Sequence, residues 1–198
     1  HNHYDHLDLP TLKALAKRSV DTKFFVPLGN AKLLNSQGVA NVTEMDWGDT
    51  ATYQDLTIHC LPTQHWSKRS ISDTRKTLWS SWAVTGPEKR FYFAGDTGYF
   101  PGFKEIGEKL GPFDVAAMPI GAYEPTAMMK ASHMDPAESV MASLDIKAKH
   151  VLAIHFGTFD LSDEPLAEPP LLFREAAATT VLAGDKTWVF DVGETRPF

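Results

Sequence analysis

Potential metal ligands crowd the start of this chain. The first six residues read H-x-H-x-D-H, which places His1, His3, Asp5 and His6 in one short segment. Neutral imidazole nitrogens and carboxylate oxygens are preferred protein ligands of zinc and of related divalent metals. Core packing does not call for this combination, so the segment predicts a metal-binding loop. The alternative is a polar terminus resembling a purification tag, against which the interleaved aspartate argues.

Three further candidate ligands each lie just beyond an apolar run typical of a buried strand: His65 after Leu56–Leu61, Asp96 after Phe91–Ala94 and His155 after Val151–Ile154. In layered α/β domains, sites gather beyond the carboxyl ends of strands. Each residue taken alone also has an ordinary explanation: His65 as a loop histidine, Asp96 as the aspartate of an Asx-turn, and His155 as a core histidine. Seven candidates exceed the three or four protein ligands that one ion uses, which predicts two ions sharing a bridging carboxylate. Asp96 suits the bridge because the glycines of its G-D-T-G turn allow close approach.

The elements that must position these residues are expected to form one α/β layered domain over residues 1–198. Predicted helices cover Pro10–Arg18, Ala31–Leu34, Gly102–Leu110, Pro136–Leu144 with Asp135 as N-cap, and a final segment entered at Glu168–Pro170. Predicted strands cover Lys23–Pro27, Val42–Asp46, Leu56–Leu61, Thr77–Val84, Arg90–Ala94, Val115–Ile120, Val151–Ile154 and Trp188–Phe190, with a Gly86-Pro87 turn between the fourth and fifth of these.

Composition excludes several classes of protein. A net charge of −6 gives no electrostatic reason to bind nucleic acid, and the short basic run of Lys68, Arg69, Arg75 and Lys76 is read as a solvated loop. The single cysteine, Cys60, rules out an internal disulfide framework and fits a reducing, cytoplasmic compartment. No apolar stretch approaches the roughly 20 residues of a membrane-spanning helix, so any contact with lipid is expected to be peripheral. His59 and His150 are predicted to be structural or solvated.

The chain resembles a known family. The H-x-H-x-D-H loop, a later histidine, an aspartate in a G-D-T turn and a histidine after a strand resemble the signature of the metallo-β-lactamase superfamily. The stretches PLGNAKLL, PTQHWSKRS, LWSSWAV, FAGDTGYF, GPFDVAAMPIGAYEP and IHFGTFDLSDEP are similar to the N-acylphosphatidylethanolamine-hydrolysing phospholipase D group, over nearly the whole chain from His1 to about Pro170.

This resemblance implies an αββα sandwich, here apparently lacking its N-terminal strands, and two Zn²⁺ ions per chain. One zinc would be held by His1, His3 and His65, and the other by Asp5, His6 and His155, with Asp96 bridging the two. His133 matches a non-ligand histidine of the family's active site, and its alternative is an exposed histidine before a helix. Asp5 and His133 are the candidate catalytic residues, and His133 would assist the leaving alkoxide.

The implied reaction is phospholipase D-type hydrolysis of an N-acylphosphatidylethanolamine-like glycerophospholipid by a hydroxide held between the metals. An acyl groove is one interpretation of Trp66, Trp79, Trp82, Met128, Met129 and Phe159, and plain core is the other. A lactonase or other small-molecule ester hydrolase, and a non-catalytic metal-binding piece, are the alternative functions. The resemblance also implies peripheral membrane contact and a homodimer. A metal loop normally follows a strand, so we expect the start of the domain, with any targeting segment, to precede His1.

Overall fold

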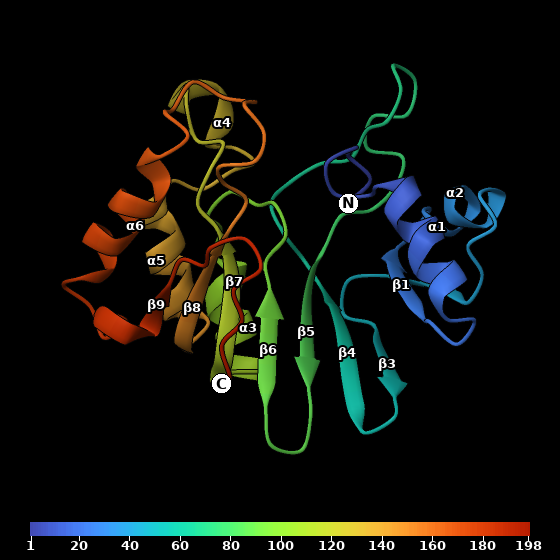
Figure 1. Ribbon diagram of the computed structural model, residues 1–198, viewed down its shortest axis with the longest axis horizontal. Helices are drawn as coiled ribbons and strands as arrows, with labels where there is room; N and C mark the ends of the chain where they lie inside the picture. The colour runs from blue at the N-terminus through green and yellow to red at the C-terminus, as the bar shows by residue number, and fades with distance from the viewer.

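The computed structural model describes residues 1–198. Seven strands form one sheet in the order β3-β4-β5-β6-β7-β8-β9. Their bounds are β3 Thr50–Tyr53, β4 Leu56–Leu61, β5 Ser81–Thr85, β6 Arg90–Phe93, β7 Phe113–Pro119, β8 Ala148–Ile154 and β9 Thr187–Trp188. Strands β3 to β6 pair antiparallel, and β6 to β9 pair parallel. Since β4 and β6 both run antiparallel to β5, the carboxyl ends of β4, β6, β7 and β8 meet at one edge, the upper edge in Figure 1.

Helices cover one face of this sheet. They are α3 Gly102–Lys109, α5 Pro136–Asp145 and α6 Glu168–Ala177, which lie behind and to the left of the strands in Figure 1. Their apolar side chains join those of β6, β7 and β8 in the main core, where Tyr92, Phe103, Phe113, Ile146 and Phe173 are fully buried. Helix α5 begins with Pro136 after a capping box in which Asp135 accepts from the Glu138 amide, so the predicted N-cap is confirmed.

A smaller unit lies at the other end of the molecule, at the right in Figure 1. It contains α1 Leu9–Arg18, β1 Phe24–Pro27, α2 Ala31–Ser36 and β2 Val42–Met45, with β1 and β2 paired parallel as a separate sheet. Its core consists of Leu7, Phe24, Val26, Leu34 and Val39. The unit places the first six residues above the carboxyl edge of the large sheet (Figure 1).

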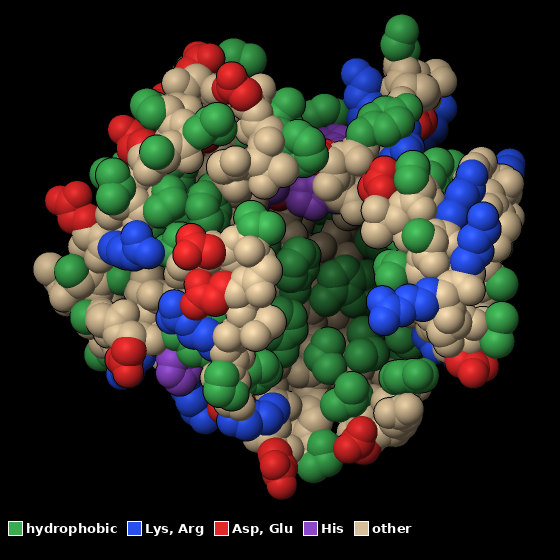
Figure 2. Space-filling view, viewed as in Figure 1, with side chains coloured by type: hydrophobic (Ala, Val, Ile, Leu, Met, Phe, Trp, Pro, Cys, Tyr) green, Lys and Arg blue, Asp and Glu red, His purple; other side chains and the backbone are tan.

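The second face of the large sheet is hollowed and apolar at its centre (Figure 2). Side chains alternate along a strand, so Phe91 and Phe93 point away from the helix side on which Tyr92 is buried. They pair with Val84 and Trp82 of β5 on the same face. Half of the expected αββα sandwich is therefore present as a sheet with helices on one side. The expectation that further strands precede His1 stays a prediction.

Two predicted strands lack two or more of their predicted residues in the structure, and three short elements were not predicted, among them the 3₁₀ helix Gly184–Lys186. The predicted Thr77–Val84 strand begins only at Ser81. The preceding backbone bonds to loops instead, because the Leu78 amide donates to the Leu28 carbonyl and the Ser67 hydroxyl to the Thr77 carbonyl. Strand β9 ends at Trp188 rather than at residue 190. Strand β3 and the one-turn helix α4, Thr126–Met129, lacked a clear apolar period. None of the helices is long and apolar enough to cross a bilayer.

Candidate metal centre

The opening segment forms a tight turn that aims its side chains at one point. The His6 and Leu7 amides both donate to the His3 carbonyl, at 3.2 and 2.9 Å. The chain then enters α1, whose N-terminus is capped by Asp8 accepting from the Thr11 amide. Because the turn and the cap fix both ends of the segment, its imidazoles and carboxylate stay over the carboxyl edge of the sheet.

The other three predicted ligands meet this turn from separate strands. His65 follows β4, Asp96 follows β6 and His155 follows β8. The loops after β4 and β6 are tied together, because the Gly98 amide donates to the Gln64 carbonyl and the Gln64 amide to the Thr97 hydroxyl. His155 has a φ of +59°, a left-handed conformation that is uncommon outside glycine and here turns the chain beside the site.

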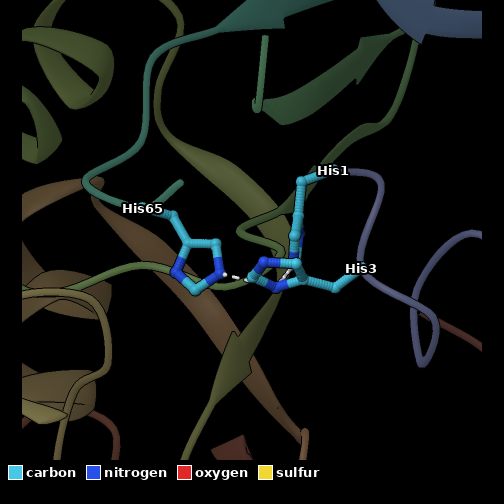
Figure 3. Close-up of side chains that lie close together, drawn as sticks. All are labelled: His1, His3 and His65. Carbon is cyan, nitrogen blue, oxygen red and sulfur yellow. Dashed lines mark hydrogen bonds between the residues drawn. The ribbon is translucent and has the colours of Figure 1, made fainter. Parts of the chain in front are cut away.

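One group of donors consists of His1, His3 and His65 (Figure 3). His3 Nδ1 lies 2.7 Å from His1 Nε2 and 3.5 Å from His65 Nε2. A single proton cannot bridge three converging ring nitrogens, whereas one cation can accept a lone pair from each. The Nδ1 atom of His65 is 2.9 Å from the Ser132 carbonyl, which orients the ring and leaves Nε2 to face the group.

A second group consists of Asp5, His6, Asp96 and His155. Asp96 Oδ2 lies 2.9 Å from His6 Nε2, and Asp96 Oδ1 lies 3.1 Å from His155 Nε2. Asp5 Oδ2 is 3.5 Å from His6 Nε2 and 3.9 Å from His155 Nε2.

Asp96 joins the two groups. Its Oδ2 atom is also 3.8 Å from His1 Nε2 and 3.7 Å from His65 Nε2, and the residue is only 4% exposed. A carboxylate at this position can offer one oxygen to each of two cations. Asp96, the residue proposed as the bridge, therefore lies between the two donor groups that the family resemblance assigns to separate ions.

The residues fit divalent cations on a further ground. Asp96 Oδ1 and His6 Nε2 are buried and have no partner in hydrogen-bonding geometry, although each has a nitrogen or oxygen of the cluster within 3.1 Å. Buried polar atoms without partners are rare in native proteins. A cation of the zinc type bound between them would satisfy both of these atoms.

The two donor groups differ in protonation. Burial lowers the pKa of His65 to about 3 and also lowers the pKa of His3. Burial opposes the charged form of His155 as well, but the Asp5 and Asp96 carboxylates outweigh it and raise the pKa of His155 to about 10. The same contacts hold the pKa of Asp96 well below its usual range despite its burial. The metal-free second group is therefore an ion-pair network.

Metal uptake by the second group should release protons at pH 8. His155, with a raised pKa, is protonated in the metal-free protein at every pH below about 10, and its proton must leave before the ring can bind a cation. Affinity at this group should therefore rise with pH up to about 10. The group that contains His65 should depend less on pH near neutrality, because burial lowers the pKa of His65 to about 3 and also lowers the pKa of His3. Titration of metal-free protein with Zn²⁺ in weakly buffered indicator dye measures the release. The His65→Ala variant should still release protons when it binds metal. If this variant released none, the assignment of the release to His155 would be contradicted.

His133 lies at the rim of the centre. Its Nε2 is 3.8 Å from Asp96 Oδ2, and its ring stacks on His155 with centroids 5.8 Å apart. Burial lowers the pKa of His133, so the ring is neutral at pH 7. With His65 and Asp96 it forms a third group within reach of a cation. The predicted role beside the metals thus stays a prediction, with a ligand role as its geometric alternative.

The remaining titratable candidates lie away from the centre. His59 contacts the Thr85 hydroxyl at 3.0 Å, and His150 contacts the Asp114 carbonyl at 3.2 Å. Both contacts agree with the prediction that these histidines are structural or solvated rather than metal ligands. Cys60 is fully buried, and burial raises the pKa of its thiol to about 11, which excludes a thiolate nucleophile at neutral pH.

The six residues offered as an acyl groove do not come together. Trp66 and Phe159 line a cavity of about 520 Å³ beside His3 and Asp5. Trp79 instead donates from its indole to the Thr63 carbonyl, and Trp82 lies on the uncovered sheet face. The interpretation of all six as one groove is therefore not supported, and the plain-core interpretation does not hold for Met128 and Phe159, which are exposed. Residue type alone does not show which strand face or loop side carries a side chain.

Two positioning residues were not identified from the sequence. Arg69 Nη1 donates to the carbonyls of Asn2 and Leu7, at 3.0 and 2.8 Å, and its guanidinium lies 4.0 Å over the Tyr4 ring. Glu164 is buried and accepts from the Ala122 amide at 2.6 Å and the Glu124 amide at 3.1 Å, holding the loop after β7. Both residues bond to backbone groups, which every residue type carries. The charged residues in PTQHWSKRS and DLSDEP therefore gave no sign of these roles.

Replacing Arg69 by alanine should weaken metal binding about 10–100-fold, the range found when groups that orient metal ligands are lost. The clamp spans both sides of the ligand turn, and its loss frees His3 and Asp5 to move. Competition with a chromophoric chelator measures the affinity. Arg69→Lys should restore part of it, and Arg75→Ala, an exposed arginine of the same loop, should leave it unchanged. Equal affinity in wild type and Arg69→Ala would exclude the clamp.

The fold and the cluster together define the class of protein: a layered α/β domain of the metallo-β-lactamase type with clustered metal-ligand side chains at the carboxyl edge of its sheet. Residues 1–156 match the family model described as a beta-lactamase superfamily domain, and the chain belongs to this superfamily. The resemblance and the fold class expected from the sequence are thereby confirmed.

Named relatives agree with the more specific resemblance. The chain is 42% identical over 206 residues to N-acyl-phosphatidylethanolamine-hydrolyzing phospholipase D 1 of Caenorhabditis elegans, covering 98% of this chain and 58% of that protein. It is 38% identical over 176 residues to the mitochondrial enzyme of that name from Saccharomyces cerevisiae, covering 85% and 37%. The chain thus spans about half the length of these curated relatives or less. Among solved structures, the metallo hydrolase Igni18 of Ignicoccus hospitalis superimposes with a TM-score of 0.73 at 24% identity, covering 98% and 75% of the two chains, which shows the shared fold.

Proposed function

We propose that this chain forms the catalytic part of a metal-dependent phosphodiesterase. It would bind two Zn²⁺ ions and hydrolyse N-acylphosphatidylethanolamine-like glycerophospholipids on the headgroup side, yielding phosphatidic acid and an N-acylethanolamine. The observation that supports the chemistry best is the pair of donor groups that meet at Asp96. The similarity to relatives named for this lipid supports the substrate class.

In this proposal His1, His3 and His65 hold one cation, Asp5, His6 and His155 hold the other, and Asp96 contacts both. When bound, such cations would lower the pKa of water and neutralise charge on phosphate oxygens. In the reaction a bond forms between the water oxygen and phosphorus, and the bond between phosphorus and the ethanolamine oxygen breaks. The proton lost by the water is balanced by the proton that the alkoxide gains.

His133 is proposed to stabilise the leaving oxygen. Its ring lies between His65 and His155, at centroid distances of 5.2 and 5.8 Å, so a phosphate beside Asp96 would be within its reach. The lowered pKa keeps the ring neutral, with an N–H that can donate a hydrogen bond to developing negative charge. This role needs no net change in the protonation of His133.

Substrate profiling tests the proposal. Metal-loaded protein is given N-acylphosphatidylethanolamine in mixed micelles, a lactone and a β-lactam, in water enriched in ¹⁸O. The expected result is cleavage of the lipid diester with the label in phosphatidic acid, because water attacks phosphorus. Cleavage of the lactone with the lipid left intact would replace the proposal by the lactonase alternative. Two bound metals with no turnover of any substrate would support the non-catalytic alternative. The homodimer stays a prediction, which sedimentation velocity of the same sample tests.

A further inference from the structure

A structured loop stands out beside the metal centre. The segment 66–80 contains no helix or strand, and it projects at the upper right in Figure 1. Asp73 Oδ1 accepts from the Arg69 and Ser70 amides at 3.0 and 2.8 Å, and the Arg75 amide donates to the Ser67 carbonyl at 2.8 Å. These bonds fix a loop whose tip carries Ile71, which is 97% exposed. A structured loop thus presents a large aliphatic side chain to solvent.

Other exposed hydrophobic side chains gather at the same edge. Tyr4, Phe159 and Leu161 are 68%, 59% and 64% exposed. All three line the cavity of about 520 Å³ that also contains the Asp5 carboxylate and His3. Single exposed hydrophobic residues are ordinary on protein surfaces, but a gathering around the opening of a site marks an interaction surface. The opening therefore leads from an apolar rim to the proposed metal ligands.

Basic side chains accompany this rim. Lys68 lines the same cavity, and Arg75 and Lys76 are exposed on the loop. In Figure 2 the projecting part at the upper right carries a hydrophobic side chain at its tip with basic side chains below it. Since the chain has a net charge of −6, attraction to an anionic surface would have to come from a local patch such as this one.

We propose that this edge docks on a membrane that contains anionic lipids. The docking surface is defined as Tyr4, Ile71, Phe159 and Leu161 together with Lys68, Arg75 and Lys76. Ile71 would enter the boundary between headgroups and acyl chains, while the basic residues contact lipid phosphates. The apolar side chains stand on three loops beside an opening rather than along a groove, with Phe159 and Leu161 on the same loop, and this arrangement fits a lipid surface better than a peptide. In this proposal the basic loop that contains Lys68, Arg75 and Lys76, expected from the sequence to be solvated, contacts anionic lipids.

The docking surface lies beside the proposed metal ligands. Asp5 and His3 lie in the wall of the cavity whose rim would face the membrane, so a lipid headgroup could reach the donors without leaving the bilayer entirely. This part of the inference rests on the proposed lipid substrate. The binding itself requires no turnover and is measured separately.

Vesicle sedimentation tests the docking. Metal-loaded protein is mixed with vesicles of phosphatidylcholine alone or with added phosphatidylglycerol. The wild type should bind the anionic vesicles more strongly. The Lys68→Gln/Arg75→Gln/Lys76→Gln variant should lose about fivefold in partitioning for each cation removed. Ile71→Ser should lose about tenfold, on both kinds of vesicle.

Matched controls distinguish binding through the docking surface from effects of charge or hydrophobicity elsewhere on the protein. Lys32→Gln/Lys104→Gln/Lys186→Gln removes three exposed cations from other elements, and Val181→Ser alters an exposed aliphatic residue on the α6 side. Both should bind vesicles as the wild type does. Equal losses in the controls, or unchanged binding by the loop variants, would overturn the proposal.

A short-chain, dispersed phosphodiester lipid distinguishes this proposal from the proposed function. Hydrolysis of that substrate should be the same in wild type and Ile71→Ser, because the loop tip touches no metal donor. If the wild type hydrolyses no phosphodiester yet binds anionic vesicles through this surface, the proposed function fails and the docking stands. If hydrolysis proceeds and the loop variants bind vesicles normally, the docking fails alone.

Discussion

Replacement of Asp96 by asparagine is expected to lower hydrolysis about a thousandfold or more and to reduce the bound metal from two ions per chain to one or none. Losing a charged ligand removes several kcal/mol of metal and transition-state stabilisation, and each 1.4 kcal/mol is about tenfold in rate. The Asp96 carboxylate lies within 3.8 Å of nitrogens from both donor groups. Asparagine keeps one neutral oxygen and replaces the other by a donor, so it can serve neither group as a bridge.

Elemental analysis of metals per chain, with steady-state kinetics on the same preparation, measures both effects. Asp114→Asn is the control, because Asp114 is a partly buried aspartate of β7 that pairs with Lys149 and not with any of the proposed ligands. That variant should keep two metals and near wild-type activity. Two metals and full activity in Asp96→Asn would contradict the bridge and, with it, the dinuclear centre.

Replacement of His133 by glutamine is expected to lower kcat about 100–1000-fold while KM and the metal content stay close to those of the wild type. Removing a positioned donor of this kind typically costs two to three orders of magnitude in rate. The ring stacks against His155 and its Nε2 lies 3.8 Å from Asp96 Oδ2, so it would be within reach of a phosphate bound beside Asp96. A residue that acts on the leaving oxygen affects the transition state more than substrate binding.

Metal analysis separates this role from its alternative. His133 can also reach a cation shared with His65 and Asp96, and in that case glutamine would lower the metal content as well as the rate. A phosphodiester with a more acidic leaving group should recover much of the lost rate if His133 assists departure, whereas a lost ligand would slow both substrates alike. His59→Gln, which alters a histidine bonded to Thr85 inside the sheet, should leave kcat unchanged.

Most of the secondary structure could be predicted because its physical signals are local. The apolar run Val115–Ile120 predicts a buried strand, which the structure has as β7 Phe113–Pro119, and the proline after Asp135 predicts the start of a helix. The loop after Ser67 shows the limit of such signals. Thr77 and Leu78 have strand-like composition, but their backbone bonds go to Ser67 and Leu28, and no local pattern records distant partners.

The candidate ligands could be named from the sequence because their signal is local as well. Imidazoles and carboxylates have few other uses at strand ends, and four in one short turn are hard to explain by packing. What composition could not show is which donors share a cation. His65 lies 3.7 Å from Asp96 because β4 and β6 run in the same direction, with β5 reversed between them, and it meets His3 because the opening turn lies over that edge of the sheet.

The sequence by itself determined the chemistry available to this protein, since side-chain type sets ligand strength and charge wherever the residue lies. The tertiary structure alone decided the arrangement. It separated the six apolar groove candidates, gathered the donors into two groups around Asp96, and placed Arg69 under the ligand turn. Distances between residues remote in the chain depend on strand order and loop paths, and these arise from the packing of the whole domain rather than from any short stretch of it.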